Sequence, residues 1–164
     1  MQINGVISEF PKEVKLLIAA FIFTLSIGFY SSIRFVDDTT NSNPQGIEER
    51  YLGNEDNVKA TKMQFKKTSA EVMTSVHSHI LSLSVIFFLL GGILTTTDIN
   101  TKLKLFLILE PFISILLTFG GIYLMWSGIG WLKYVILFSG ILMTITFSLA
   151  VFFIFKGLLI KKQI

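Results

Sequence analysis

The apolar residues of this chain lie in four long blocks, without the short periodicity of a soluble domain. No charged residue lies between Lys15 and Arg34, and none between Glu71 and Asp98, where two histidines stand. The two blocks that follow are divided by Lys133 and contain one carboxylate. Runs of about 18 or more apolar residues predict membrane spans, which must be helical because lipid offers no partner to backbone groups. The pattern predicts transmembrane helices over residues 16–34, 75–97, 103–126 and 132–156.

The polar segment 37–70 is predicted to be a structured outer loop between the first two spans. Asn43 is typical of a helix N-cap, Pro44 of a first helical residue and Gly53 of a helix stop. A short helix is therefore expected over residues 44–52.

Two further features of this loop predict how it joins the bundle. Ile47 and Tyr51 are four residues apart and would form one apolar edge of the short helix. We expect that edge to lie on the bundle, on the membrane surface or on a neighbouring subunit. The run Thr68-Ser69-Ala70-Glu71 matches a capping box, which predicts that the second long helix begins near Ser69.

These elements predict an all-α integral membrane four-helix bundle, with residues 1–164 as one membrane domain. Charged residues make up 15% of the chain, against about 25% in soluble domains. The absence of cysteine excludes disulfides, iron–sulfur clusters, thiolate metal sites and covalently attached haem on this chain. No basic patch interleaved with aromatic residues is present, so a nucleic-acid partner is not expected.

The even number of spans places both termini on one side of the membrane. Each side carries seven Lys and Arg residues, but those on the terminal side are concentrated in short tails and one short loop. This density predicts cytoplasmic termini. We therefore expect a multi-pass protein of the bacterial inner (cytoplasmic) membrane, in contact with lipid.

Glycines and aromatic residues complete the expected architecture. Small residues allow close helix crossings, and interfacial aromatic residues mark the edge of the bilayer. Trp126, Trp131 and Tyr134 are therefore expected at the outer interface. Close crossings are expected at Gly91, Gly92, Gly120, Gly121, Gly128, Gly130 and Gly140.

The two histidines, His77 and His79, open the second apolar block and are placed at the outer membrane boundary. Residues two apart point about 200° apart on a helix, so one helix cannot aim both rings at one ion. One interpretation is a ligand of haem b or of a metal ion, for which neutral imidazole is suited. The alternative is a polar collar that binds headgroups, carbonyl groups or water, with no cofactor. Between the two histidines, we favour His79 as the ligand.

The predicted ligand site needs support from further residues. Ser75 and Ser82 share a helix face with His79, and their hydroxyls are expected to orient its ring through the second nitrogen. The chain has no third histidine, so a second ligand must come from a second copy, a partner subunit or a methionine: Met63, Met73 or Met125.

Glu110 is the one carboxylate within the third block. Intramembrane carboxylates are costly and carry function by default, and the adjacent Pro111 removes a helical hydrogen bond. Ser114 and Thr118 continue a stripe at helical spacing, so this face is expected to look into protein. Glu110 is interpreted as a proton carrier, an ion ligand or a quinone-contacting acid, or else as a brace between helices. An axial distance of roughly 20 Å from His79 excludes a shared metal site.

Several positions resemble a group of uncharacterised small bacterial four-helix membrane proteins that have H-x-H at the start of the second span. The matching residues fall within roughly residues 44–92, and the resemblance implies no activity. They are Gly46, Ile47, Tyr51, Gly53, Lys66, His77 and His79.

The sequence favours a small integral subunit of a respiratory or redox membrane assembly, in which His79 or His77 serves electron transfer by binding haem or a metal. Other membrane subunits, or further copies of the chain, are the expected partners. The first alternative is a purely structural or assembly subunit without a cofactor. The second is an oligomeric proton or small-solute transporter that uses Glu110. A freestanding enzyme is not expected, because no nucleophile–base constellation is present.

Overall fold

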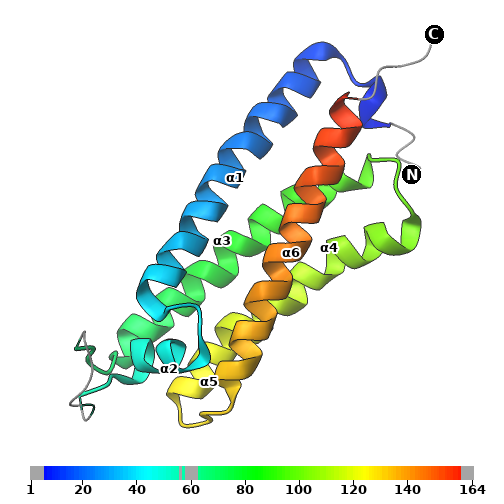
Figure 1. The fold of residues 1–164 in the computed structure, drawn as a ribbon. Coiled ribbons are helices and arrows are strands. Elements are labelled where there is room, and N and C mark those ends of the chain that lie inside the picture. Colours follow the sequence, from blue (N-terminus) through cyan, green and yellow to red (C-terminus); the bar gives the residue numbers. More distant parts are fainter. Residues whose placement is uncertain (1–5, 56, 58–62, 160–164) are drawn as a thin grey trace.

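In the computed structural model, which describes residues 6–55, 57 and 63–159, four long helices run side by side (Figure 1). Each is long and apolar enough to cross a membrane. The all-α four-helix class is therefore confirmed. The third span consists of three consecutive pieces, the middle one being π-helical. The spans are α1 (Lys12–Thr40), α3 (Ser69–Thr95), α4 (Thr101–Ile115) with the π-helical segment Leu116–Gly120 and α5 (Gly121–Trp126), and α6 (Leu132–Leu159).

The helices extend beyond the predicted apolar spans, because polar residues outside the lipid continue them. At 1.5 Å per residue, the 27 residues of α3 measure about 40 Å, against a hydrocarbon core of about 30 Å. The start of α3 at Ser69 is confirmed, with the capping box closed as predicted. The Thr68 hydroxyl accepts a hydrogen bond from the Glu71 backbone, and the Glu71 carboxylate accepts one from the Thr68 N–H.

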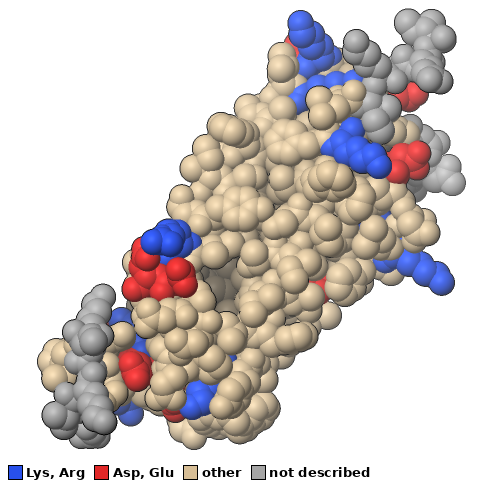
Figure 2. All heavy atoms as spheres, viewed as in Figure 1, with Lys and Arg blue, Asp and Glu red and all other residues tan. Residues whose placement is uncertain are grey.

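The two ends of the bundle differ in composition from its middle. The start of α1, the end of α6 and the turn between α3 and α4 lie at one end of the bundle, and helix α2 and the turn between α5 and α6 lie at the other (Figure 1). On the face shown in Figure 2, charged side chains gather toward these two ends, and the surface between them is almost uncharged. This distribution fits a bundle whose middle is surrounded by lipid.

Helix α2 (Pro44–Leu52) confirms the predicted short helix of the outer loop. The Asn43 side chain accepts a hydrogen bond from the Gly46 backbone at 2.8 Å. Ile47 and Tyr51 are both buried, so the apolar edge lies on the bundle as expected. A Cβ at Gly46 would lie 1.9 Å from the Thr40 carbonyl oxygen, so only glycine permits this close approach of α2 to α1.

Three contacts hold the loop between α1 and α3 against the end of the bundle that carries α2. The Trp126 indole N–H donates to the Lys67 carbonyl at 2.9 Å, and the Lys66 ammonium lies over the Trp126 ring. Lys133 Nζ forms an ion pair with Glu48 Oε2 at 2.5 Å. Because Trp126 and Lys133 come from α5 and the start of α6, the loop is held by the third and fourth spans.

Helix α1 is the least buried of the four spans and joins the others through aromatic side chains. The rings of Phe29 and Phe147 stack at 3.8 Å, and Phe87 of α3 meets both rings edge-on. Phe147 and Phe87 are buried. This cluster connects α1, α3 and α6 near the middle of the bundle.

The expectation that glycines lie at close helix crossings is correct at some positions only. A Cβ at Gly121 would lie 2.9 Å from Ile136 of α6, and one at Gly91 would lie 3.6 Å from Ile108 of α4. One at Gly130 would be 3.6 Å from the Glu48 carboxylate of α2. The others face open space, with no heavy atom within 4 Å of the added Cβ: Gly92, Gly120, Gly128 and Gly140.

Candidate functional site

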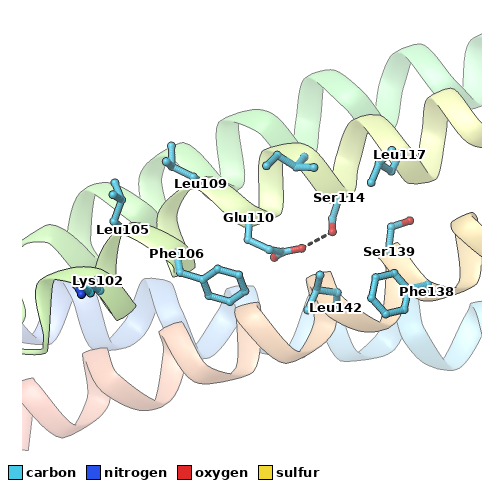
Figure 3. Close-up of a pocket in the computed structure, with 11 residues that line it drawn as sticks. Lys102, Leu105, Phe106, Leu109, Glu110, Ser114, Leu117, Phe138, Ser139 and Leu142 are labelled. Carbon is cyan, nitrogen blue, oxygen red and sulfur yellow. Dashed lines mark hydrogen bonds between the residues drawn. The ribbon is translucent and has the colours of Figure 1, made fainter.

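Glu110 of α4 lies in the contact between α4 and α6 and is only 4% exposed. Its Oε1 accepts a hydrogen bond from the Ser114 hydroxyl one turn along the same helix (Figure 3). Its Oε2 accepts one from the Thr146 hydroxyl of α6 at 2.6 Å. The expectation that Glu110 faces protein and bonds another helix is confirmed. The partner, Thr146, was not identifiable from the sequence, because it lies 36 residues away.

A second interhelical hydrogen bond continues this arrangement. The hydroxyls of Thr118, in the π-helical segment, and Ser139, in α6, lie 2.7 Å apart, and both residues are buried. We call the five residues of this arrangement the polar ladder: Glu110, Ser114, Thr118, Ser139 and Thr146. It places every polar group of the predicted stripe against a partner, as lipid surroundings require.

The polar ladder can bond Glu110 in the charged or the neutral form, with only the Thr146 hydroxyl proton turning. A carboxylate accepts from both hydroxyls. A neutral carboxyl can donate its proton to Thr146 Oγ1, because the Thr146 hydroxyl can then donate to the Met143 carbonyl, 3.0 Å away. A hydroxyl has one proton and two acceptor positions, so both patterns satisfy every group. Both carboxyl oxygens of Glu110 therefore keep a hydrogen-bond partner in either protonation state.

A groove of about 500 Å³ lies beside the polar ladder. Its walls are apolar side chains of α4 and α6, and Figure 3 shows Glu110, Ser114 and Ser139 among the side chains that line it. We call this the α4–α6 groove. It was not predicted, because its shape depends on how two distant segments pack.

His79 is exposed on α3, with one of its ring nitrogens bound to the chain. Nδ1 lies 2.7 Å from the Ser75 carbonyl oxygen. A carbonyl only accepts, so Nδ1 donates this hydrogen bond, and in the neutral ring Nε2 has the lone pair. The ring stacks on Phe119 of the third span, with centroids 4.8 Å apart and planes 21° apart. Ring orientation and tautomer are thus both fixed.

His77 is also exposed, and within the described part of the chain its ring makes no hydrogen bond and no ring contact. The two rings therefore have different surroundings, as their spacing predicted.

The prediction that the hydroxyls of Ser75 and Ser82 orient the His79 ring is wrong. The Ser75 backbone carbonyl binds Nδ1, whereas its hydroxyl was expected to. The Ser82 hydroxyl donates to the carbonyl of Ser78 at 2.7 Å and so serves its own helix. Hydroxyls in helices commonly bond the carbonyl one turn back, and this local bond prevails here.

The predicted axial distance between His79 and Glu110 needs correction. The stacking partner of His79, Phe119, lies seven residues before Trp126, which corresponds to about 10 Å of helix. His79 therefore lies about 10 Å from Trp126, toward the middle of the bundle. Its axial distance from Glu110, nine residues before Phe119, is about 13 Å, not roughly 20 Å. A shared metal site is still excluded.

The candidate second ligands differ in accessibility. Met125 is fully buried, while Met63 and Met73 are 57% and 47% exposed. Within the described residues, no group of three or more His, Cys, Asp or Glu side chains could hold a metal ion. Any cofactor on His79 would therefore need a ligand from another polypeptide or from an exposed methionine.

Comparison with known proteins points to the membrane as well. A family model described as a transmembrane helical domain matches residues 41–164, about three quarters of the chain. The comparisons with curated proteins and with solved structures gave no significant match.

The polar ladder predicts how the bundle responds to replacement of Glu110. Glu110→Leu removes an interhelical hydrogen bond, which should lower the free energy of unfolding in detergent by about 1–2 kcal/mol. Glu110→Gln retains an acceptor for Ser114 or Thr146 and should cost less. Equal losses for the two variants would show that the carboxyl does not act through hydrogen bonding.

Proposed function

Because the chain belongs to the Aq_1264_TM family of transmembrane helical domains, we propose that it works inside the membrane, as a small subunit of a respiratory or redox assembly. In this proposal His79 is a ligand of haem b or of a metal ion. His77, on another side of the helix, contacts a neighbouring subunit or the headgroup region.

The free Nε2 of His79 is the observation that carries this proposal. A polar nitrogen within a span costs free energy unless something binds it. Nδ1 is bound by the Ser75 carbonyl at 2.7 Å, and Nε2 has no hydrogen-bond partner among the described residues. This is the usual arrangement of a ligating histidine, in which one nitrogen donates to a carbonyl and the other binds the metal.

The cofactor needs a second ligand, and this ligand would come from another polypeptide. In this proposal the chain is therefore one subunit of an assembly. His77 cannot supply the second ligand, because the two rings diverge on one helix. A second copy of the chain or another membrane protein, seated on the exposed face of α3, would complete the coordination. When bound there, haem or a redox metal would supply one-electron transfer, and the chain would supply one oriented imidazole and an aromatic neighbour, Phe119.

A second candidate function is proton or small-solute transport through Glu110 in an oligomer. It is favoured by the polar ladder, which satisfies the carboxyl in either protonation state. His79 of α3 and Glu110 of α4 are about 13 Å apart along the bundle, so the two functions would use separate sites. A structural subunit without a cofactor is the outcome that remains if neither site is active.

The proposed orientation puts both termini in the cytoplasm of a bacterial cell, with α2 outside. It is supported by the concentration of Lys and Arg in short segments on the terminal side. The ion pair of Lys133 with Glu48 offsets one of the cations on the opposite side.

The ligand role predicts the spectrum and metal content of protein purified in mild detergent from its native membranes. Haem should give a Soret band with split α and β bands, and elemental analysis would reveal another metal. His79→Ala should remove the cofactor, because it deletes the ligand. His77→Ala, two residues away, is the matched control and should leave it in place. Wild-type protein without haem or metal, or equal contents in all three proteins, would contradict the proposal.

The orientation predicts labelling by an impermeant thiol reagent in intact cells, and the chain has no cysteine of its own. Cysteine at Glu55, which is exposed beside α2, should react. Cysteine at Thr101, exposed at the start of α4, should react only after lysis. The adjacent Asn54 is a poor position because it is buried. The opposite labelling pattern would reverse the proposed orientation.

A further inference from the structure

The α4–α6 groove has the length of one membrane leaflet. On α4 it runs from Lys102 in the first turn to Leu117 in the π-helical segment, which is about 22 Å of helix. Half of a bilayer, headgroups included, measures about 20–22 Å. The groove therefore spans the leaflet on the side of the chain termini.

The groove is lined mainly by apolar side chains, and almost none of its polar groups is available to a ligand. Its walls are formed by Phe106, Leu109 and Ile113 of α4 and by Phe138 and Leu142 of α6, among others. The polar side chains at its floor are already bonded within the polar ladder. A polar headgroup would find no partner at this depth, so the occupant here must be a hydrocarbon chain.

One cation stands at the mouth of the groove. Lys102 lines it in the first turn of α4 (Figure 3). Within the described residues its ammonium has no ion pair and no hydrogen bond. The neighbouring Lys104 differs, because its ammonium is held by the carbonyls of Thr95 and Thr97. Lys102 is therefore available to an anionic group outside the protein.

We propose that the α4–α6 groove binds one anionic phospholipid, with its phosphate on Lys102 and one acyl chain along Leu109 toward Leu117. The charge of Lys102 fits the lipid phosphate, and the length and apolar walls of the groove fit an acyl chain. The bound chain covers the polar ladder on its open side. The proposal does not depend on His79 or on any cofactor.

The test is native mass spectrometry of the purified, delipidated full-length protein. Phosphatidylglycerol and phosphatidylcholine with identical acyl chains are added separately, and bound lipid is counted. The wild type should retain one phosphatidylglycerol and much less phosphatidylcholine. Lys102→Ala should weaken phosphatidylglycerol binding about fivefold, the effect expected of one cation near an anionic surface. Lys156→Ala removes an exposed cation at the same end but outside the groove, and should change little.

A second pair of variants tests the seat of the acyl chain. Leu109→Trp fills the groove and should displace the lipid, whereas Leu89→Trp, on an exposed position of α3, should not. Circular dichroism verifies that each variant is helical. Equal binding of the two lipids, equal losses for the two lysine variants, or retention of lipid by Leu109→Trp would overturn the proposal. So would a lipid-free dimer that Leu109→Trp dissociates, because the occupant would then be a second copy.

Discussion

A carboxyl group inside a membrane must be bonded on all sides, and the packing of α4 against α6 follows from this requirement. Glu110 bonds Ser114 of its own helix and Thr146 of α6, and Thr118 bonds Ser139 further along. Between membrane helices the hydrophobic effect gives little attraction, so such hydrogen bonds and close packing hold the bundle together. Gly121, with Ile136 of α6 directly beside it, provides that close packing next to Thr118 of the polar ladder.

The same requirement separates the two candidate sites. Glu110 has its partners inside the chain, so its local surroundings are complete. His79 has one nitrogen bonded to Ser75, and the other has no hydrogen-bond partner among the described residues. Under the proposed function, a ligand on the α3 side would bind this second nitrogen. The α4–α6 groove, with Lys102 at its mouth, is formed by other helices than the one that carries His79.

Local features of the chain could be predicted from sequence because they depend on neighbouring residues. The caps at Asn43 and Thr68, the helix 44–52 and the apolar spans all have this character. It could also be predicted that Glu110 faces protein, because a charge in lipid costs free energy. The π-helical segment, the Thr146 partner and the groove could not be predicted, because they arise when segments tens of residues apart pack together. The axial distance between His79 and Glu110 was overestimated because sequence does not reveal the contact of His79 with Phe119.

The most direct test of the polar ladder is a double-mutant cycle between Glu110→Leu and Thr146→Val, measured by reversible unfolding in detergent. A cycle with Thr144→Val is the control, because the Thr144 hydroxyl bonds only the Gly140 carbonyl of its own helix. The account predicts a coupling energy of about 0.6–1.7 kcal/mol for the Glu110–Thr146 pair and none for the control pair. Additive effects of Glu110→Leu and Thr146→Val would contradict it, because α4 and α6 would then be held together without this hydrogen bond.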